Sequence, residues 1–355
     1  MSSSDSKLGW LRESVWILTT PSAAVEWKAD QADRTTFDGL EVSELRSGTR
    51  RVIAALREAL AEGGVEALAE THVACVRSSL SYRIASWVLE LVYPLSALLG
   101  FVAAAEHFVV ESGLVDGARR ALEELPIRWQ VEYPHGDRRS FASGPLVVFG
   151  RHGSVLTPFL VAAALGRRDL HMLGATYVAA LGPGVACRVH PVHLPVPTLR
   201  TAARRGILLR IGAWAVSRLN TPTNKATARR TNLESLRSAA DYVREGGALL
   251  IAPDAPNPRE SWRVGIGLIA CRLSEGEPVA DVLFVPYRIW ASITGLFHIL
   301  SPNPLLRAAG RWEYRKPIRI AFGEPIALSA VVNRGGADPT RITRYLETYY
   351  RELGY

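Results

Sequence analysis

Apolar positions recur at helical spacing in the N-terminal third of the chain. Leucines and alanines follow this spacing from Ser43 to Glu70, with Gly63-Gly64 as an interruption. The window Ile84 to Ala105 is apolar except for one charge, Glu90, and is long enough for a bilayer span, which needs about 20 residues. Because a carboxylate in mid-bilayer is costly and Pro94 interrupts the window, we expect a buried helical hairpin or a helix lying in the membrane interface.

From about residue 126 the pattern changes to short strands alternating with helices. Ile127 to Tyr133 alternates like a half-buried strand, and Leu146 to Gly150 is a short apolar run ending in glycine. Further strands are predicted at 188–194, 248–252, 282–287 and 318–322, and helices at 157–165, 231–245, 264–273 and 340–352. Thr231 and Glu234 have capping-box spacing, which predicts a helix start. This alternation indicates an α/β fold with a central mixed, largely parallel sheet flanked by helices.

Composition narrows the class of protein. The chain has 355 residues, of which 48% are hydrophobic and 21% charged, so it is too apolar to be disordered and long enough for a large core. We expect an N-terminal helical region, residues 1–125, and an α/β domain, residues 126–355. The three cysteines, Cys75, Cys187 and Cys271, form no CxxC pair, which argues against a disulfide scaffold or zinc ribbon. With no secretory signal visible at the start, we expect a cytoplasmic protein.

The formal net charge of +8 is concentrated in one segment. Residues 196–230 carry eight Lys or Arg and no acid, interleaved with apolar residues. This mixture predicts either an amphipathic helix lying on an anionic membrane surface or anionic ligand, or a core-packed helix with a solvated basic face. The candidate surface for an anionic partner comprises Arg200, Arg204, Arg205 and Arg210. Such a surface would place the protein at the inner face of the membrane.

His152 is the first candidate for chemistry. It directly follows the predicted strand 146–150 and precedes Gly153-Ser154 and a predicted helix. Ligands of open α/β sheets bind at this carboxyl edge. A neutral histidine accepts a proton from a hydroxyl or amine near pH 7, and amides at the helix start suit an oxyanion or phosphate. The alternative is an ordinary turn histidine.

A second stretch, residues 252–263, follows the predicted strand 248–252. It places Asp254 at the strand end among prolines, with Arg259 and Arg263 close behind. Prolines restrict the backbone, so the loop should be stiff and could form a binding rim. The alternative is a loop with a solvated aspartate. His190 and His193 suggest a metal, but residues three apart on a strand face opposite sides, so we expect no metal site.

The order of these parts resembles the glycerolipid acyltransferase family, the PlsC-like glycerol-3-phosphate and lysophosphatidic acid acyltransferases. The resemblance covers about residues 127–330, and the set of motifs in one order carries it. The matching parts are His152 to Thr157, Arg188, Ala252-Pro253-Asp254, Arg263-Val264-Gly265, Val285-Pro286 and Phe322-Gly323-Glu324-Pro325.

The resemblance implies an enzyme of phospholipid metabolism in which His152 takes a proton from an acceptor hydroxyl. The acceptor would attack an acyl thioester, of coenzyme A or acyl carrier protein, without an acyl-enzyme. Gly153 and Ser154 would contact substrate, and the phosphate or another anionic group of a small acceptor would be held by Arg188, Arg259 and Arg263. No bound cofactor is implied.

The motifs also depart from the family pattern. Asp254 replaces the glutamate of the third motif, and Thr157 stands where the family has the acid that orients the histidine. A threonine hydroxyl can orient an imidazole but cannot neutralise an imidazolium. Either Asp254 or Asp169 supplies the charge, or the reaction needs less base, as with an amine or hydroxylamine nucleophile or an activated ester donor, or activity is lost. The alternatives are therefore an acyltransferase that uses aminoacyl-tRNA in specialised metabolism, and a catalytically decayed, membrane-peripheral binding protein.

Overall fold

The computed structural model describes residues 42–78, 82–83, 86, 90, 94–134, 141–152, 156–194, 224–254, 261–275, 282–290, 298–301 and 303–354. The chain divides into two compact units. The first comprises residues 1–104, 196–221 and 297–309, and the second comprises residues 105–195, 222–296 and 310–355. The second unit thus contains most of the chain after residue 105.

The first unit contains long helices. Helix α3 (Val42–Ser78) has an interruption at Gly64, where φ is +67°, which confirms the break expected at the glycine pair. Helix α5 (Leu95–Glu123) begins in this unit and continues into the second, with a second interruption at Gly113. Helix α13 (Pro304–Glu313) likewise begins in the first unit and ends in the second.

The one charge of the apolar window, Glu90, is satisfied by protein groups within the first unit. Its Oε1 accepts hydrogen bonds from the Ser96 amide at 2.7 Å and the Ser96 hydroxyl at 2.6 Å. The His72 ring lies between the Ser96 hydroxyl, 3.0 Å from Nε2, and the Tyr82 hydroxyl, 2.8 Å from Nδ1. Burial raises the pKa of Glu90 and lowers the pKa of His72 to about 4. Such a network suits a packed helical segment, because each polar group has a protein partner.

A membrane-length helix is also present. Within the described residues, Ser96–Glu123 is the one helix long and apolar enough to cross a bilayer, and 56% of its most apolar window is buried in protein. Length and composition alone give weak evidence for a span, because buried core helices share both properties.

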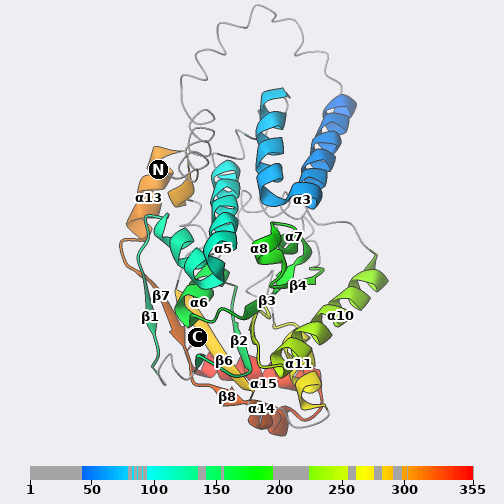
Figure 1. Cartoon of the computed structure of the whole chain (residues 1–355), viewed down its shortest axis with the longest axis vertical. Helices are drawn as coiled ribbons and strands as arrows, with labels where there is room; N and C mark the ends of the chain where they lie inside the picture. The colour runs from blue at the N-terminus through cyan, green and yellow to red at the C-terminus, as the bar shows by residue number, and fades with distance from the viewer. Residues whose placement is uncertain are drawn as a thin grey trace, which may run out of the picture. The chain divides into compact units, whose positions relative to one another are not determined.

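The second unit is built on an eight-stranded sheet (Figure 1). Its strands are β1 (Trp129–Glu132), β2 (Leu146–Gly150), β3 (Leu170–Ala175), β4 (Val189–Val192), β5 (Ala248–Ile251), β6 (Leu283–Trp290), β7 (Ile318–Phe322) and β8 (Ile326–Ala327). The order is β1-β7-β6-β2-β5-β3-β4, with β8 paired to β6. Strands β6, β2, β5, β3 and β4 are parallel, whereas β7 and β8 run antiparallel to β6. The predicted mixed, largely parallel α/β sheet is confirmed.

Helices connect and cover these strands. They are α6 (Thr157–Leu165), α7 (Thr176–Ala179), α8 (Pro183–Ala186), α10 (Lys225–Arg244), α11 (Gly265–Ser274), α14 (Leu328–Gly335) and α15 (Pro339–Glu352). The expected start of α10 at Thr231 is wrong. Asn224 caps the helix instead, since its side chain accepts a hydrogen bond from the Thr227 amide at 2.8 Å. Strand β3 was not anticipated from the sequence.

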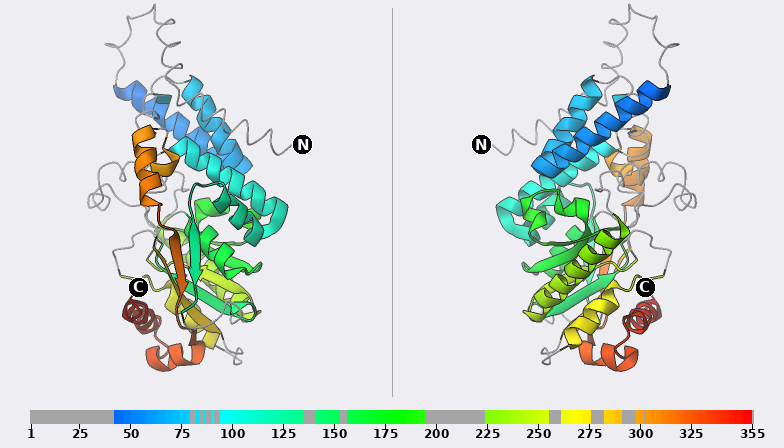
Figure 2. Two further views of the ribbon diagram at one scale, coloured as in Figure 1. Left: turned by 90° about the vertical axis from the view of Figure 1, so that its left-hand side faces the viewer. Right: turned by 90° about the vertical axis from the view of Figure 1, so that its right-hand side faces the viewer.

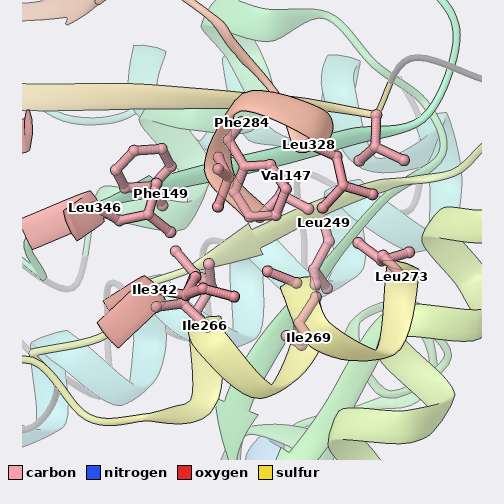
Figure 3. Packing of buried hydrophobic residues seen from close by; sticks show 14 of the residues in the cluster. Val147, Phe149, Leu249, Ile266, Ile269, Leu273, Phe284, Leu328, Ile342 and Leu346 are labelled. Atoms are coloured by element: carbon pink, nitrogen blue, oxygen red, sulfur yellow. The ribbon is translucent and has the colours of Figure 1, made fainter. Parts of the chain in front are cut away.

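The main core of the second unit lies between the sheet and one layer of helices. Val147 and Phe149 of β2 point to the same side, where they meet Ile266 and Ile269 of α11 and Leu346 of α15 (Figure 3). Helices α10 and α11 lie along this face (Figure 2). All five residues of β2 are buried, as expected for a central parallel strand that is covered on both faces.

Candidate functional site

The candidate site lies where two neighbouring strands end. Strands β2 and β5 are parallel and in register, with Phe149 opposite Ile251. His152 follows the end of β2, and Asp254 follows the end of β5. Because parallel strands share one carboxyl edge, the two residues meet there although they are far apart in sequence.

A hydrogen bond joins these two residues. The Asp254 Oδ1 accepts the backbone amide of His152 at 3.0 Å, so the carboxylate holds the histidine backbone rather than the imidazole. Asp254 is only 2% exposed. Its other oxygen, Oδ2, has no hydrogen-bond partner within the described part of the chain. The carboxyl therefore keeps one oxygen available beside the histidine loop.

The residues before His152 are fixed from a third strand. The Tyr287 hydroxyl of β6 donates to the Arg151 carbonyl at 3.3 Å, and Tyr287 is fully buried. A Cβ on Gly150 would lie 2.3 Å from the Tyr287 carbonyl oxygen, so glycine is required where these strands approach. Close packing of β2 against β6 thus explains the glycine at the end of the apolar run 146–150. Together these contacts hold the turn that carries His152.

Burial shapes the protonation of both groups. His152 is partly exposed, and burial lowers the pKa of its imidazole below the ordinary value. Burial also raises the pKa of Asp254, while the His152 amide and the Arg151 charge oppose that rise. A histidine with a lowered pKa is neutral at pH 7, which is the form that accepts a proton.

Thr157 and Asp169 were the other groups considered as orienting or neutralising partners. Thr157 is the first residue of α6 and is 1% exposed, so this position lies in the protein interior. Asp169 is bound by Arg167, whose Nε and Nη2 donate to its two oxygens at 2.7 and 2.6 Å. It precedes β3 and so lies at the amino end of the parallel strands. Asp169 is therefore not at the edge that carries His152.

Arg188 is likewise not brought to the site. It precedes β4, and its Nη1 donates to the carbonyl of Arg168, which precedes β3, at 2.7 Å. Both residues lie at the amino edge of the parallel strands, whereas His152 lies at the carboxyl edge. A four-residue strand spans about 13 Å. The expectation that Arg188 shares an anion site with His152 is therefore wrong for this arrangement.

Arg263 does lie close to the end of β5. Its backbone amide donates to the Pro253 carbonyl at 2.9 Å, which holds the residues before α11 against the loop of Asp254, and its side chain is exposed. The remaining candidates lie outside the described residues. They are Gly153, Ser154 and Arg259, and Arg200, Arg204, Arg205 and Arg210 of the basic segment.

Sequence reasoning missed Tyr287 as a support of the site. The residue directly follows Val285-Pro286, which belongs to one of the recognised motifs, so this position carried a signal. It also missed the pairing of His171 with His190, because β3 was not predicted. Within the residues that the structure describes, no group of three or more His, Cys, Asp or Glu side chains is arranged to hold a metal ion.

Comparison with known proteins gives a distant structural likeness. No family model matches the sequence, and no curated protein matches it. Among solved structures, one match is the crystal structure of the 1-acyl-sn-glycerophosphate (LPA) acyltransferase PlsC from Thermotoga maritima. It is 15% identical, with a TM-score of 0.38, and the match covers 77% of this chain and 96% of that chain. The likeness concerns the fold.

Proposed function

We propose that this protein is an acyltransferase in which His152 is the general base. The observation that carries the proposal is the position of His152 at the carboxyl edge of β2, with its backbone tied to Asp254 at the end of the adjacent strand. This edge is where open α/β sheets bind their ligands. The order of motifs around His152 in the sequence favours acyl transfer over other chemistry.

The reaction would proceed by direct attack on an activated acyl donor. The imidazole takes the proton of an acceptor hydroxyl or amine while the acceptor oxygen or nitrogen forms a bond to the acyl carbonyl carbon. The carbon–sulfur bond of a thioester then breaks, and the proton passes from the imidazolium to the departing thiolate. Placing a base of suitable pKa against the reacting group contributes about 10²- to 10⁴-fold to the rate.

Asp254 would act on this step through position and charge. Its Oδ1 fixes the His152 backbone, and Oδ2 is a second acceptor in the same buried place. A carboxylate near a histidine favours the imidazolium that forms during the reaction. We propose that this carboxyl takes over part of the task of the acid absent at position 157.

Substrate binding is proposed for residues close to His152 and Asp254 in the sequence. Arg263, and with it Arg259, Gly153 and Ser154, would contact the anionic part of a phosphate-bearing or other small acceptor. The default donor is acyl-CoA or acyl carrier protein, with aminoacyl-tRNA as the alternative donor. Arg200, Arg204, Arg205 and Arg210 would provide an anionic-partner surface, which would place a cytoplasmic protein at the inner face of the membrane.

Mass spectrometry of reaction products tests this proposal. Purified protein is incubated with glycerol phosphates, lysophospholipids and small amines, together with acyl-CoAs, acyl carrier proteins or charged tRNA. We expect an acylated product with wild type. We also expect it with the control variant His107→Ala, which removes a histidine on α5 that pairs with Glu111. We expect none with His152→Ala. A product that forms equally well with His152→Ala would remove the proposal, and the donor that gives a product identifies the donor class.

A further inference from the structure

A cavity open to solvent lies on the helix-covered side of β3 and β4, away from His152. It has a volume of about 570 Å³, and its floor includes His171 of β3 and His190 of β4. Its wall is one face of α10, with Glu234, Asp241, Tyr242 and Glu245 among the lining residues. Each histidine is the second residue of its strand, so the cavity lies toward the amino ends of the strands. The proposed acyl transfer at the carboxyl edge makes no use of it.

Two imidazole nitrogens face each other across these strands. The distance from His171 Nδ1 to His190 Nε2 is 3.3 Å, and the ring centroids are 5.4 Å apart. Two nitrogens bound to one zinc ion at about 2.0–2.1 Å in tetrahedral geometry lie about 3.3–3.4 Å apart. The pair therefore already has the separation of two neighbouring ligands.

The position of His171 is supported by its surroundings. Its ring stacks on Tyr242 with a centroid distance of 3.8 Å and an interplanar angle of 13°. The Tyr242 hydroxyl donates to the Asp169 carbonyl at 2.6 Å. Partners that fix the ring of a histidine ligand raise the affinity of a metal site, because less ordering is needed on binding.

Charge and protonation around the pair are compatible with a cation. Each neutral imidazole carries one lone pair that can bind a metal ion. Among the carboxylates of the cavity, Asp241 pairs with Arg244 at 3.1 Å, whereas Glu245 has no ion pair with the described residues. Arg188 near His171 and Arg237 in the cavity wall oppose a cation.

We propose that His171 and His190 bind a divalent transition metal ion of the zinc, nickel or copper type in this cavity. Imidazole ligands select these ions over magnesium and calcium. His171 Nδ1 and His190 Nε2 supply two ligands, and water completes the coordination. Without metal, either His171 Nδ1 or His190 Nε2 carries the proton of the hydrogen bond between the two rings. On metal binding that proton moves to the other nitrogen of the same ring, so no net proton is released.

Metal titration of the untagged full chain tests the proposal. Zn²⁺ and Ni²⁺ are titrated calorimetrically into wild type, His171→Asn, His190→Asn and His193→Asn, with circular dichroism as the check of folding. His193 is the matched control, because it is three residues from His190 and hydrogen-bonds to Asn232 through its backbone. Loss of an outer partner of a ligand costs about 10- to 100-fold in affinity, so loss of either ligand should cost at least about tenfold. His193→Asn should bind as wild type does.

A measurement on wild type alone covers the case in which a variant fails to fold. Addition of Zn²⁺ should shift the imidazole NMR resonances of His171 and His190 and leave those of His193 unchanged. The proposal is overturned if wild type binds neither ion, if its affinity equals that of the two ligand variants, or if His193→Asn loses binding equally. This site is independent of the proposed acyl transfer, so either proposal can fail alone.

Discussion

The carboxylate of Asp254 accepts the backbone amide of His152 at 3.0 Å, which joins the ends of β5 and β2 through a side chain. The sequence offered Asp254 and Asp169 as alternative groups that could supply a negative charge to the imidazole. The hydrogen bond instead fixes the backbone of His152, and through it the position from which the imidazole side chain extends. Asp254 is thus a structural support of the site, and its second oxygen is left for other partners.

Loss of the Asp254 carboxylate should weaken both folding and turnover. In Asp254→Ala the amide of His152 loses its partner, and a buried unpaired donor costs about 1–3 kcal/mol. Asp254→Asn keeps an acceptor oxygen and should lose less stability. Urea unfolding of the two variants beside wild type measures the difference. Equal stability of Asp254→Ala and wild type would contradict the role of this bond.

Gly150→Ala should destabilise the second unit. The added Cβ would lie 2.3 Å from the Tyr287 carbonyl oxygen, and overpacking of a core costs about 1–3 kcal/mol. Gly265→Ala is the matched control, since its Cβ would meet Leu236 at an ordinary 3.5 Å. Thermal unfolding should therefore show a lower Tm for Gly150→Ala alone. A Tm unchanged by Gly150→Ala would contradict this expectation, because it would mean that β2 and β6 can move apart at Gly150 without cost.

The pH dependence of turnover should reflect the lowered pKa of His152. The base must be neutral to act, and burial moves its protonation to lower pH than the usual histidine value of about 6.5. As the pH falls, kcat/KM should therefore decline with a midpoint below the usual histidine value. The profile is measured with an acceptor that does not titrate between pH 5 and 8. An acidic limb centred above pH 7 would be incompatible with this environment of His152.

Arg188→Ala should leave the reaction nearly unchanged, in contrast to the family expectation. Its guanidinium contacts the Arg168 carbonyl at the opposite edge of the sheet from His152. Two positions that are more than about 7–10 Å apart and share no partner are seldom coupled energetically by more than about 0.5 kcal/mol. A change at Arg188 should therefore alter the rate of a reaction at His152 by no more than roughly twofold. Steady-state kinetics at varied acceptor concentration measures this. A large rise in KM would show that Arg188 reaches the acceptor.

Much of the α/β fold was accessible from the sequence, because buried strands and their glycine ends leave local patterns. Leu146 to Gly150 and Thr157 to Leu165 were predicted with the bounds that the structure has. Strand β3 was missed because His171 and Gly174 interrupt its apolar run. The start of α10 was misplaced, since Thr231 has the residue type of a cap but lies inside a helix that Asn224 begins.

The site was only partly accessible, because the sequence does not specify which strands lie side by side in the sheet. His152 and Asp254 follow predicted strands, so their edge could be inferred. Arg188 precedes its strand, and reading it as part of the same site ignored that direction. The support from Tyr287 depends on the neighbouring order of β2 and β6, which no local pattern specifies.

The most direct test of His152 as the general base is the ratio of kcat/KM for wild type and His152→Ala with the donor and acceptor that give a product. Removal of a general base should lower the value by about 10²- to 10⁴-fold. His107→Ala should stay near wild type under the same conditions. A His152→Ala protein that folds normally and turns over at the wild-type rate would contradict the assignment.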